Sequence, residues 1–402
     1  MGAIQSFLTD KLQAKYAEQL IDDTMFRVKQ RSRLLDQFMP IKTFDNNKFI
    51  GYLTEKLMPI ASFITRDGRI PTAAHGGFQR MVGELQLVGL AHQFDGKTQE
   101  EMLELIEEAQ YKNQPIMSMP NMSGTGMIRG INDTFAETIY NKIEGLVFGI
   151  TDVLTAMSWD VVCTGEINRT DARTGVSLVV NFKDDSASYT SKHFPTALVT
   201  TGNTANPKLN KWDDLEYADG IGLLQDWVLD YQDTNGFKPD LIVMSERRLI
   251  NLCQQKTTIE KSRQLAGFGG VGAVSMNTLS QVLIAYGIPP IKTYDEYYQV
   301  PYTNAQNSTA TRDKYVDNAR FLPENRVVML KTDMGVQAMG QTIEMKHFQN
   351  NINQTRLSQE GSSILVMVNS RSQLPLLDTI ESMSVLLPVV MNPKYLAGRV
   401  VV

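Results

Sequence analysis

The chain has 402 residues, of which 42% are hydrophobic and 21% charged, and its formal net charge is −5. This length and composition are typical of a globular protein with two or three cores and exclude a disordered chain. No uninterrupted apolar run approaches the roughly 18–20 residues that cross a bilayer, and no basic patch of the kind that grips nucleic-acid phosphates is evident, so we expect neither of those two classes.

The first ninety-five residues predict two elements without a core of their own. From about Ser6 to Met39, apolar side chains recur at helical spacing between many charges, and the basic stretch Arg27–Gln37 is expected to be a solvated helix face. Phe49–Thr65 and Phe78–Phe94 are rich in β-branched and aromatic residues, and the stretch between them contains Asp-Gly, Pro and Gly-Gly. This pattern predicts a long β-hairpin whose arms exceed the strands of a compact domain, so the hairpin should project and find a partner surface.

The strongest helix signal in the chain covers Thr134–Cys163. Thr134 and Glu137 form a capping-box pair, apolar residues hold one continuous stripe, and Gly165 stands where a C-terminal glycine cap belongs. About thirty residues at about 1.5 Å each give a rod of roughly 45 Å, which is typical of a structural backbone. A shorter acidic helix is expected over residues 97–112.

After the long helix, predicted strands and helices alternate. Strands are expected at Gly175–Phe182, Lys238–Ser245, Pro289–Tyr298 and Asn325–Thr332, helices at Gly220–Gly236, Glu246–Gln255 and Met276–Gly287, and extended segments in the last forty residues. The fold class is therefore α+β, with an α/β-like unit from about Trp212 to Gln341.

A glycine-rich stretch raises the question of a nucleotide site. Gly267, Gly269 and Gly272 have the G-x-G-x-x-G spacing of a dinucleotide-binding turn. Such a turn needs a strand before it and a carboxylate about twenty residues later, whereas polar residues precede these glycines and no carboxylate stands at that distance. Because Gly270 adds a fourth glycine, a mobile loop is the better interpretation.

The other residues that could carry chemistry do not form a catalytic pattern. The four histidines have no zinc-ligand spacing, and no nucleophile elbow or Walker loop is present. We interpret Asp184–Asp185 and Asp213–Asp214 as exposed turn residues. The three tryptophans, Trp159, Trp212 and Trp227, are expected in the core, and the two cysteines, Cys163 and Cys253, as buried free thiols. We therefore expect no enzyme, no cofactor and no metal.

The order of the later segments resembles the major capsid protein E family of lambda-like tailed phages. The similarity lies in "CTGEI" after the long helix, a strand ending "VVNF", Trp212–Asp213, "GFKPDLIVMSERRLINL", "GIPPIKTYDEYY", and "FLPENRVVMLKTDMGVQAMGQTIE" with its glycines Gly335 and Gly340. It is clearest from Thr134 to Glu344, about half of the chain.

The resemblance implies a Hong Kong 97-like capsid fold. Its parts would be an N-terminal arm at 1–45, an extended β-hairpin loop at 46–96, a peripheral domain at 97–211 with the spine helix at 134–163, an axial domain at 212–341, and a C-terminal return to the peripheral domain at 342–402. The glycine loop would then lie in the axial domain, where Gly267, Gly269, Gly270 and Gly272 let one chain fit both pentamers and hexamers.

The implied function is that of a major capsid (head) protein. Pentamers and hexamers would assemble into an icosahedral shell around double-stranded DNA, which faces the inner wall without sequence-specific binding. The protein would be made in the host bacterial cytoplasm and reside in the virion, with portal and scaffolding proteins as partners, a decoration protein as a further candidate, and no membrane. From their position at the hairpin tip, we expect Arg66, Asp67, Gly68 and Arg69 to contact a neighbouring subunit through ion pairs.

Two other classes of protein stay open. An encapsulin-like compartment shares the fold but encloses a cargo enzyme, and the contents of the shell distinguish it. A nucleotide-dependent enzyme would show a thermal shift with NAD or ATP.

Overall fold

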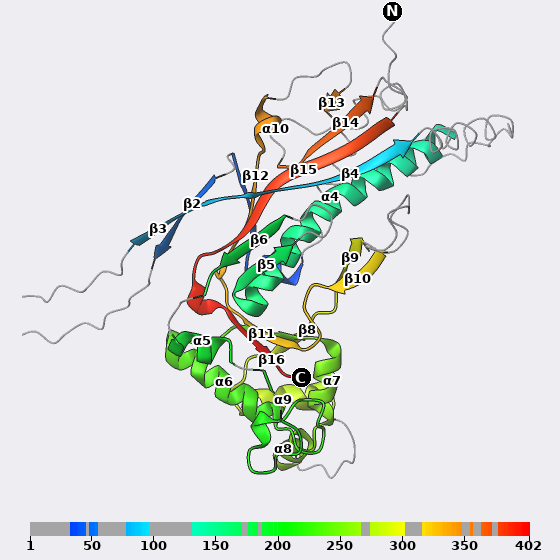
Figure 1. Ribbon diagram of the computed structural model, residues 1–402. Coiled ribbons are helices and arrows are strands. Elements are labelled where there is room, and N and C mark those ends of the chain that lie inside the picture. The colour runs from blue at the N-terminus through cyan, green and yellow to red at the C-terminus, as the bar shows by residue number, and fades with distance from the viewer. Residues whose placement is uncertain are drawn as a thin grey trace, which may run out of the picture.

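The computed structural model has two hydrophobic cores on either side of a four-stranded sheet (Figure 1). It describes residues 33–45, 48–54, 78–95, 131–170, 176–183, 187–195, 197–198, 200–266, 274–301, 316–347, 354–356, 363–371 and 377–402. We call the two clusters the larger core, which surrounds the long helix, and the smaller core, which lies near the opposite end of the molecule. The predicted α+β class is confirmed.

The larger core is built on one long helix, α4 (Ile131–Thr164), and a six-stranded sheet. The strands of the sheet are β1 (Ile41–Phe44), β4 (Gln86–Asp95), β12 (Gly335–Gly340), β13 (Gln354–Arg356), β14 (Leu365–Arg371) and β15 (Leu377–Val390). The fourteen-residue β15 pairs antiparallel with β4, β12 and β14, while β13 pairs antiparallel with β14 and β1 parallel with β12. β15 therefore links all parts of the sheet.

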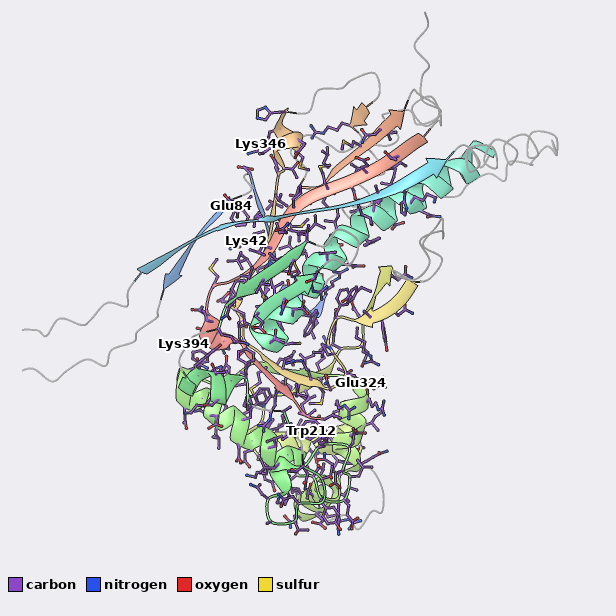
Figure 2. All side chains as sticks on the ribbon, in the orientation of Figure 1. Lys42, Glu84, Trp212, Glu324, Lys346 and Lys394 are labelled. Atoms are coloured by element: carbon purple, nitrogen blue, oxygen red, sulfur yellow. The ribbon has the colours of Figure 1, made fainter. Side chains whose placement is uncertain are left out.

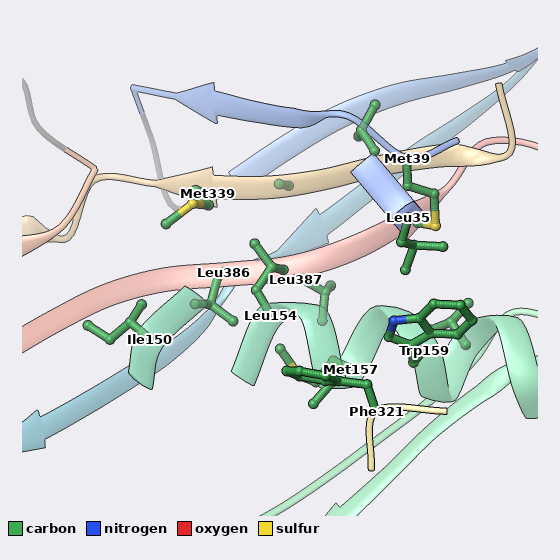
Figure 3. Packing of buried hydrophobic residues seen from close by; sticks show 14 of the residues in the cluster. Leu35, Met39, Ile150, Leu154, Met157, Trp159, Phe321, Met339, Leu386 and Leu387 are labelled. Atoms are coloured by element: carbon green, nitrogen blue, oxygen red, sulfur yellow. The ribbon is translucent and has the colours of Figure 1, made fainter. Parts of the chain in front are cut away.

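The predicted apolar stripe of α4 is confirmed over the part whose side chains are described. Its buried members are Ile143, Leu146, Val147, Ile150, Leu154, Met157 and Val161, which share the larger core with Leu386 and Leu387 of β15 (Figure 3). Gly165 ends the helix with φ +73° and donates its N–H to the carbonyl of Val161 at 2.7 Å, as the glycine cap predicts. Among the described residues, Asn141–Thr164 is long and apolar enough to span a membrane, but 72% of its most apolar window is buried, as expected of a core helix.

The four-stranded sheet lies between the cores and contributes one face to each. Its strands, in spatial order, are β16 (Ala397–Val400), β11 (Arg326–Leu330), β7 (Leu241–Met244) and β8 (Ile291–Thr293). Alternate side chains point to opposite faces of a strand, so Val243, Val328 and Leu330 enter the larger core, while Ile242, Val327 and Met329 enter the smaller one. These central strands are apolar on both faces for that reason.

The helices that follow the long helix in the chain lie around the smaller core. They are α5 (Ala187–His193), α6 (Gly220–Asn235), α7 (Glu246–Gln254), α8 (Lys256–Ala266) and α9 (Met276–Ala285). Trp212 and Trp227 are buried here and Trp159 is buried in the larger core, as predicted, and the thiols of Cys163 and Cys253 are buried and free. Burial raises the pKa of the Cys163 thiol to about 12, so this thiol stays protonated at neutral pH.

Three two-stranded ribbons and four short helices complete the described fold. The ribbons are β2 (Lys48–Thr54) with β3 (Phe78–Glu84), β5 (Glu166–Thr170) with β6 (Ser177–Asn181), and β9 (Tyr297–Pro301) with β10 (Val316–Arg320). The short helices are η1 (Leu34–Gln37), η2 (Pro207–Leu209), α10 (Ile343–His347) and η3 (Pro393–Tyr395).

Some predicted boundaries were wrong. α4 begins at Ile131, so Thr134 lies inside the helix and is not its N-cap; the pair Thr134 and Glu137 has the spacing of a capping box without its position. The single strand predicted at Pro289–Tyr298 is divided between β8 and β9. Lys256–Ala266 is a further helix, which ends immediately before the glycines. The predicted helix at residues 97–112 lies outside the described residues.

Several pairings cross the bounds of the predicted domains, which stay a prediction. β12 belongs to the six-stranded sheet of the larger core, although the predicted axial domain ran to Gln341. β16 returns to the sheet between the cores, where a return to the peripheral domain was expected. Met39, from the predicted N-terminal arm, is buried in the larger core. These pairings join segments that are distant in the sequence.

Candidate assembly surfaces

The ribbon β2–β3 is the most prominent projection of the described molecule. Its strands pair antiparallel from Lys48–Glu84 to Thr54–Phe78, and among the described residues no other strand pairs with either of them. Figure 1 shows the ribbon extending beyond the six-stranded sheet. Because an isolated two-stranded ribbon is marginally stable in water, this geometry calls for a covering surface outside the described fold.

The direction of the ribbon is set by the larger core. β3 ends at Glu84 and β4 begins at Gln86, and the residue between them, Leu85, is 6% exposed in the larger core. β4 then pairs with β15 over ten residues. The predicted second hairpin arm, Phe78–Phe94, is therefore two strands: one lies in the ribbon and the other belongs to the sheet.

Strand β4 presents a second surface suited to contact. Val88 and Leu90 pack against the larger core, whereas Leu87 on the opposite face is 53% exposed. Within the described part of the chain, β4 pairs with β15 alone. A strand paired on one side offers the N–H and C=O groups of its other side to a further strand.

The N-terminal segment is fixed to the long helix by a buried arginine. Arg33 is 6% exposed, donates to the carbonyl of Thr151 at 3.1 Å, and also bonds Thr155 Oγ1 and pairs with Asp152. Its guanidinium lies over the ring of Phe321, 5.3 Å from the centroid. The prediction that Arg27–Gln37 is a solvated helix face was therefore wrong for Arg33, because its charge is satisfied by partners on α4.

Asp36, on η1, ties the same segment to the sheet. Its carboxylate accepts hydrogen bonds from the backbone N–H of Arg33 at 3.0 Å and from the side chain of Gln337 on β12 at 2.7 Å. Burial raises the pKa of the Asp36 carboxyl, while these hydrogen bonds oppose the shift. Arg33 and Asp36 thus attach the segment that follows residues 1–32 to α4 and to β12.

An ion-pair cluster ties α7 to Asp213 and to Glu324, which lies shortly before β11. Arg248 on α7, with a side chain 5% exposed, pairs with Asp213 and with Glu324, the latter at 3.1 Å (Glu324 is labelled in Figure 2). Asn251 also donates to Asp213, at 2.6 Å. Asp213 is 47% exposed, in accord with the predicted turn, and its partners give it a structural role.

The outer face of α9 carries apolar side chains without charge. Ile284 is 77% exposed and Met276 is 50% exposed, and no residue from Met276 to Ala285 is acidic or basic. Ser280 lies between them on the exposed face. An uncharged helix face at the surface of the smaller core suits contact with another protein surface.

The predicted site residues lie outside the described residues. Arg66, Asp67, Gly68 and Arg69 fall within residues 55–77, and Gly267, Gly269, Gly270 and Gly272 fall within residues 267–273. Asp184–Asp185 are likewise not described. In the described ranges, no group of three or more histidine, cysteine or acidic residues could hold a metal ion.

No protein-family model matches the chain, and no curated protein matches it. Among solved structures, it is similar to a prophage protein of E. coli CFT073 assigned to the capsid (12% identity, TM-score 0.49), covering 94% of this chain and 98% of that one. It is also similar to the satellite phage P4 procapsid that includes the size determination (Sid) protein, with 10% identity, a TM-score of 0.39, and coverage of 94% of this chain and 98% of that one.

A third similar structure is a virus-like particle from Pyrococcus furiosus, with 10% identity, a TM-score of 0.36, and coverage of 96% of this chain and 98% of that one. All three TM-scores are below 0.5. We therefore base the function on the surfaces described above and on the sequence.

Proposed function

We propose that the protein is the major capsid protein of a tailed phage, whose pentamers and hexamers form an icosahedral shell around double-stranded DNA. The observation that carries the proposal is the ribbon β2–β3, which leaves the sheet at Leu85 and pairs only with itself among the described residues. In a closed shell, each subunit supplies such a projection and receives one from a neighbour, so every ribbon is covered.

Other features of the chain support this function. The edge of β4 that no described strand covers and the uncharged face of α9 offer two further contact surfaces, at opposite cores of the subunit. The 34-residue α4, packed along the larger sheet, makes each subunit a stiff element. The net charge of −5 suits a wall that faces packed DNA without gripping it, because strong phosphate contacts would hinder packaging and release.

The proposed partners follow from this role. Copies of the same chain are the main partners, and portal and scaffolding proteins, with a decoration protein as a further candidate, complete the head. The proposed location is the virion, after synthesis in the host bacterial cytoplasm. The alternative is an encapsulin-like compartment, which would use the same surfaces to enclose a cargo enzyme.

The test is electron microscopy of the full-length protein, expressed alone and purified by size-exclusion chromatography. We expect closed shells, capsomers or hexagonal sheets. Coexpression with candidate scaffolding proteins serves as the second condition, and the ratio of absorbance at 260 and 280 nm reports nucleic acid inside the shells. A monomer or dimer under both conditions would contradict the proposal, and an enclosed enzyme without DNA would establish the compartment.

We further propose that Arg66 and Arg69 make ionic contacts with a neighbouring subunit, together with Asp67 and Gly68. Residues 55–77 connect the two strands of the projecting ribbon, so these charges belong to the segment best placed to reach another copy. The double variant Arg66→Glu, Arg69→Glu should lower shell yield severalfold, because like charges would then face the neighbour's acidic partners. The double variant Arg66→Lys, Arg69→Lys keeps the charge and is the control; equal shell yields for both variants would exclude ionic contacts.

For Gly267, Gly269, Gly270 and Gly272, we propose a loop that adopts different conformations in pentamers and hexamers. They connect α8 and α9, the helix with the uncharged outer face. Four glycines in six residues permit many backbone conformations at little steric cost.

A further inference from the structure

His193, at the end of α5, lies in a fully buried aromatic cluster. It is 0% exposed, stacks on Tyr189 with ring centroids 4.3 Å apart, and lies 5.2 Å from the ring of Tyr231 on α6. Its Nδ1 is 2.9 Å from the carbonyl oxygen of Leu396. Because a carbonyl only accepts hydrogen bonds, Nδ1 carries the proton of the neutral ring and Nε2 is bare. Nε2 is buried and has no hydrogen-bond partner among the described residues.

The same cluster holds the segment that leads into the last strand. Tyr189 donates its hydroxyl to the carbonyl of Pro393 and lies 3.3 Å from that of Leu396, and the Tyr231 hydroxyl donates to the carbonyl of Tyr395 at 3.3 Å. Three side chains thus bind backbone carbonyls of Pro393–Leu396. The next residues form β16, an edge strand of the sheet between the two cores.

We propose that His193 is an acid-sensitive clasp on the C-terminal segment Pro393–Val400, which loosens when the imidazole takes a second proton on Nε2. That proton would place a positive charge and an N–H donor among aromatic rings, where the described residues offer Nε2 no acceptor. When the segment opens, water reaches the ring, solvates the positive charge and accepts the hydrogen bond from the new N–H. This inference rests on the described contacts alone and is independent of the proposed function.

The surrounding charges favour the neutral ring. Burial lowers the pKa of His193, and the ammonium of Lys192 on the same helix acts in the same direction, whereas the Leu396 carbonyl opposes it. From α6, the ring of Tyr231 lies beside it, and burial raises the pKa of the Tyr231 hydroxyl far above its usual range. Lys394 and Tyr395 are the titratable residues that precede Leu396, whose carbonyl binds the ring. No carboxylate contributes to the shift of the His193 pKa.

The sign of the pH effect follows from linkage. Since the pKa of His193 in the closed state lies below the ordinary value of 6.5, the open state binds more protons at mildly acidic pH. Opening therefore becomes easier as the pH falls below about 6.5, by up to about tenfold per pH unit, until the closed-state pKa is reached. Above about pH 6.5, the ring is neutral in both states and opening does not depend on pH.

Hydrogen exchange on the full-length protein, measured by mass spectrometry at pH 7 and pH 5, tests the proposal. After correction for intrinsic exchange, the protection of residues 393–400 should fall by up to about 20-fold relative to that of α4. His193→Asn keeps a donor near the position of Nδ1 and cannot be protonated, so its protection should not fall. His347→Asn, at an exposed histidine on α10, is the matched control and should behave as wild type.

Two results would overturn the clasp. One is an equal loss of protection in His193→Asn and in wild type. The other is a wild-type loss spread over all segments, or centred on β4, where burial also lowers the pKa of His92. The second comparison needs only wild-type protein, so the test stands even if the asparagine variant does not fold.

Discussion

Gly398→Val will lower the free energy of unfolding by at least about 3 kcal/mol. A Cβ atom at position 398 would lie 2.3 Å from the carbonyl oxygen of Cys163 and 3.1 Å from that of Val162, both in the last turn of α4. These are backbone atoms and cannot rotate away. Arg326 also donates to the Cys163 carbonyl at 2.7 Å, so a shift of the helix end would break that bond. The last turn of α4 and strand β16 can approach each other this closely only if residue 398 is a glycine.

Urea denaturation followed by circular dichroism measures this effect. Gly145→Ala in the same helix is the control, because a Cβ atom there meets no atom within 4 Å and the residue is exposed. Alanine is a better helix former than glycine, so this variant should gain up to about 1 kcal/mol. A Gly398→Val variant within about 1 kcal/mol of wild type would show that the helix and β16 do not approach so closely.

Local patterns in the sequence predicted much of the helical structure. The apolar stripe on α4 follows from the 3.6-residue period, and the glycine cap at Gly165 follows from the need for positive φ at a helix end. Burial of Trp159, Trp212 and Trp227 follows from their size and apolar character. Each of these signals depends on residues close together in the chain.

Pairings between distant segments were not predictable in the same way. β4 and β15 pair from Leu377–Asp95 to Leu386–Gln86, nearly three hundred residues apart, and nothing local encodes that choice. Gly335 is half of the Gly335 and Gly340 motif in the sequence, but the need for glycine there appears only in the pairing: a Cβ at position 335 would lie 2.2 Å from the carbonyl oxygen of Val389 on β15.

The candidate assembly surfaces were predicted in part. The β-branched and aromatic residues of the arms, with the turn residues between them, indicated a projecting hairpin, and β2–β3 is such a ribbon. The buried Leu85 that ends it looks like any other apolar strand residue. Arg33 lies in a basic stretch that resembles a solvated face, and its burial depends on partners more than a hundred residues away. The charged residues from Arg66 to Arg69 stay a prediction.

A variant with a shortened ribbon should fold but lose most of its shell assembly. Thr54 and Phe78 face each other in the ribbon register, so an Asn-Gly turn can replace residues 55–77 and close the two strands directly. Both cores stay intact, because Leu85 and β4 are untouched. We expect an unfolding midpoint close to that of wild type and at least about tenfold fewer shells, since assembly sums many modest contacts and the removed segment supplies one at every subunit.

Sedimentation velocity and electron microscopy of the two proteins at equal concentration measure the loss. The matched control replaces residues 171–176 by Asn-Gly in the ribbon β5–β6, where Thr170 faces Ser177. That ribbon is anchored by Leu178 and Val180 against the larger core, so it needs no neighbour to cover it and its shortening should leave assembly unchanged. Shells at wild-type yield from the β2–β3 variant would show that the projection is not an assembly element. An equal loss of shells in both variants would show that assembly depends on turns in general and not on the reach of β2–β3. The proposed role of the ribbon requires that only the β2–β3 variant lose its shells.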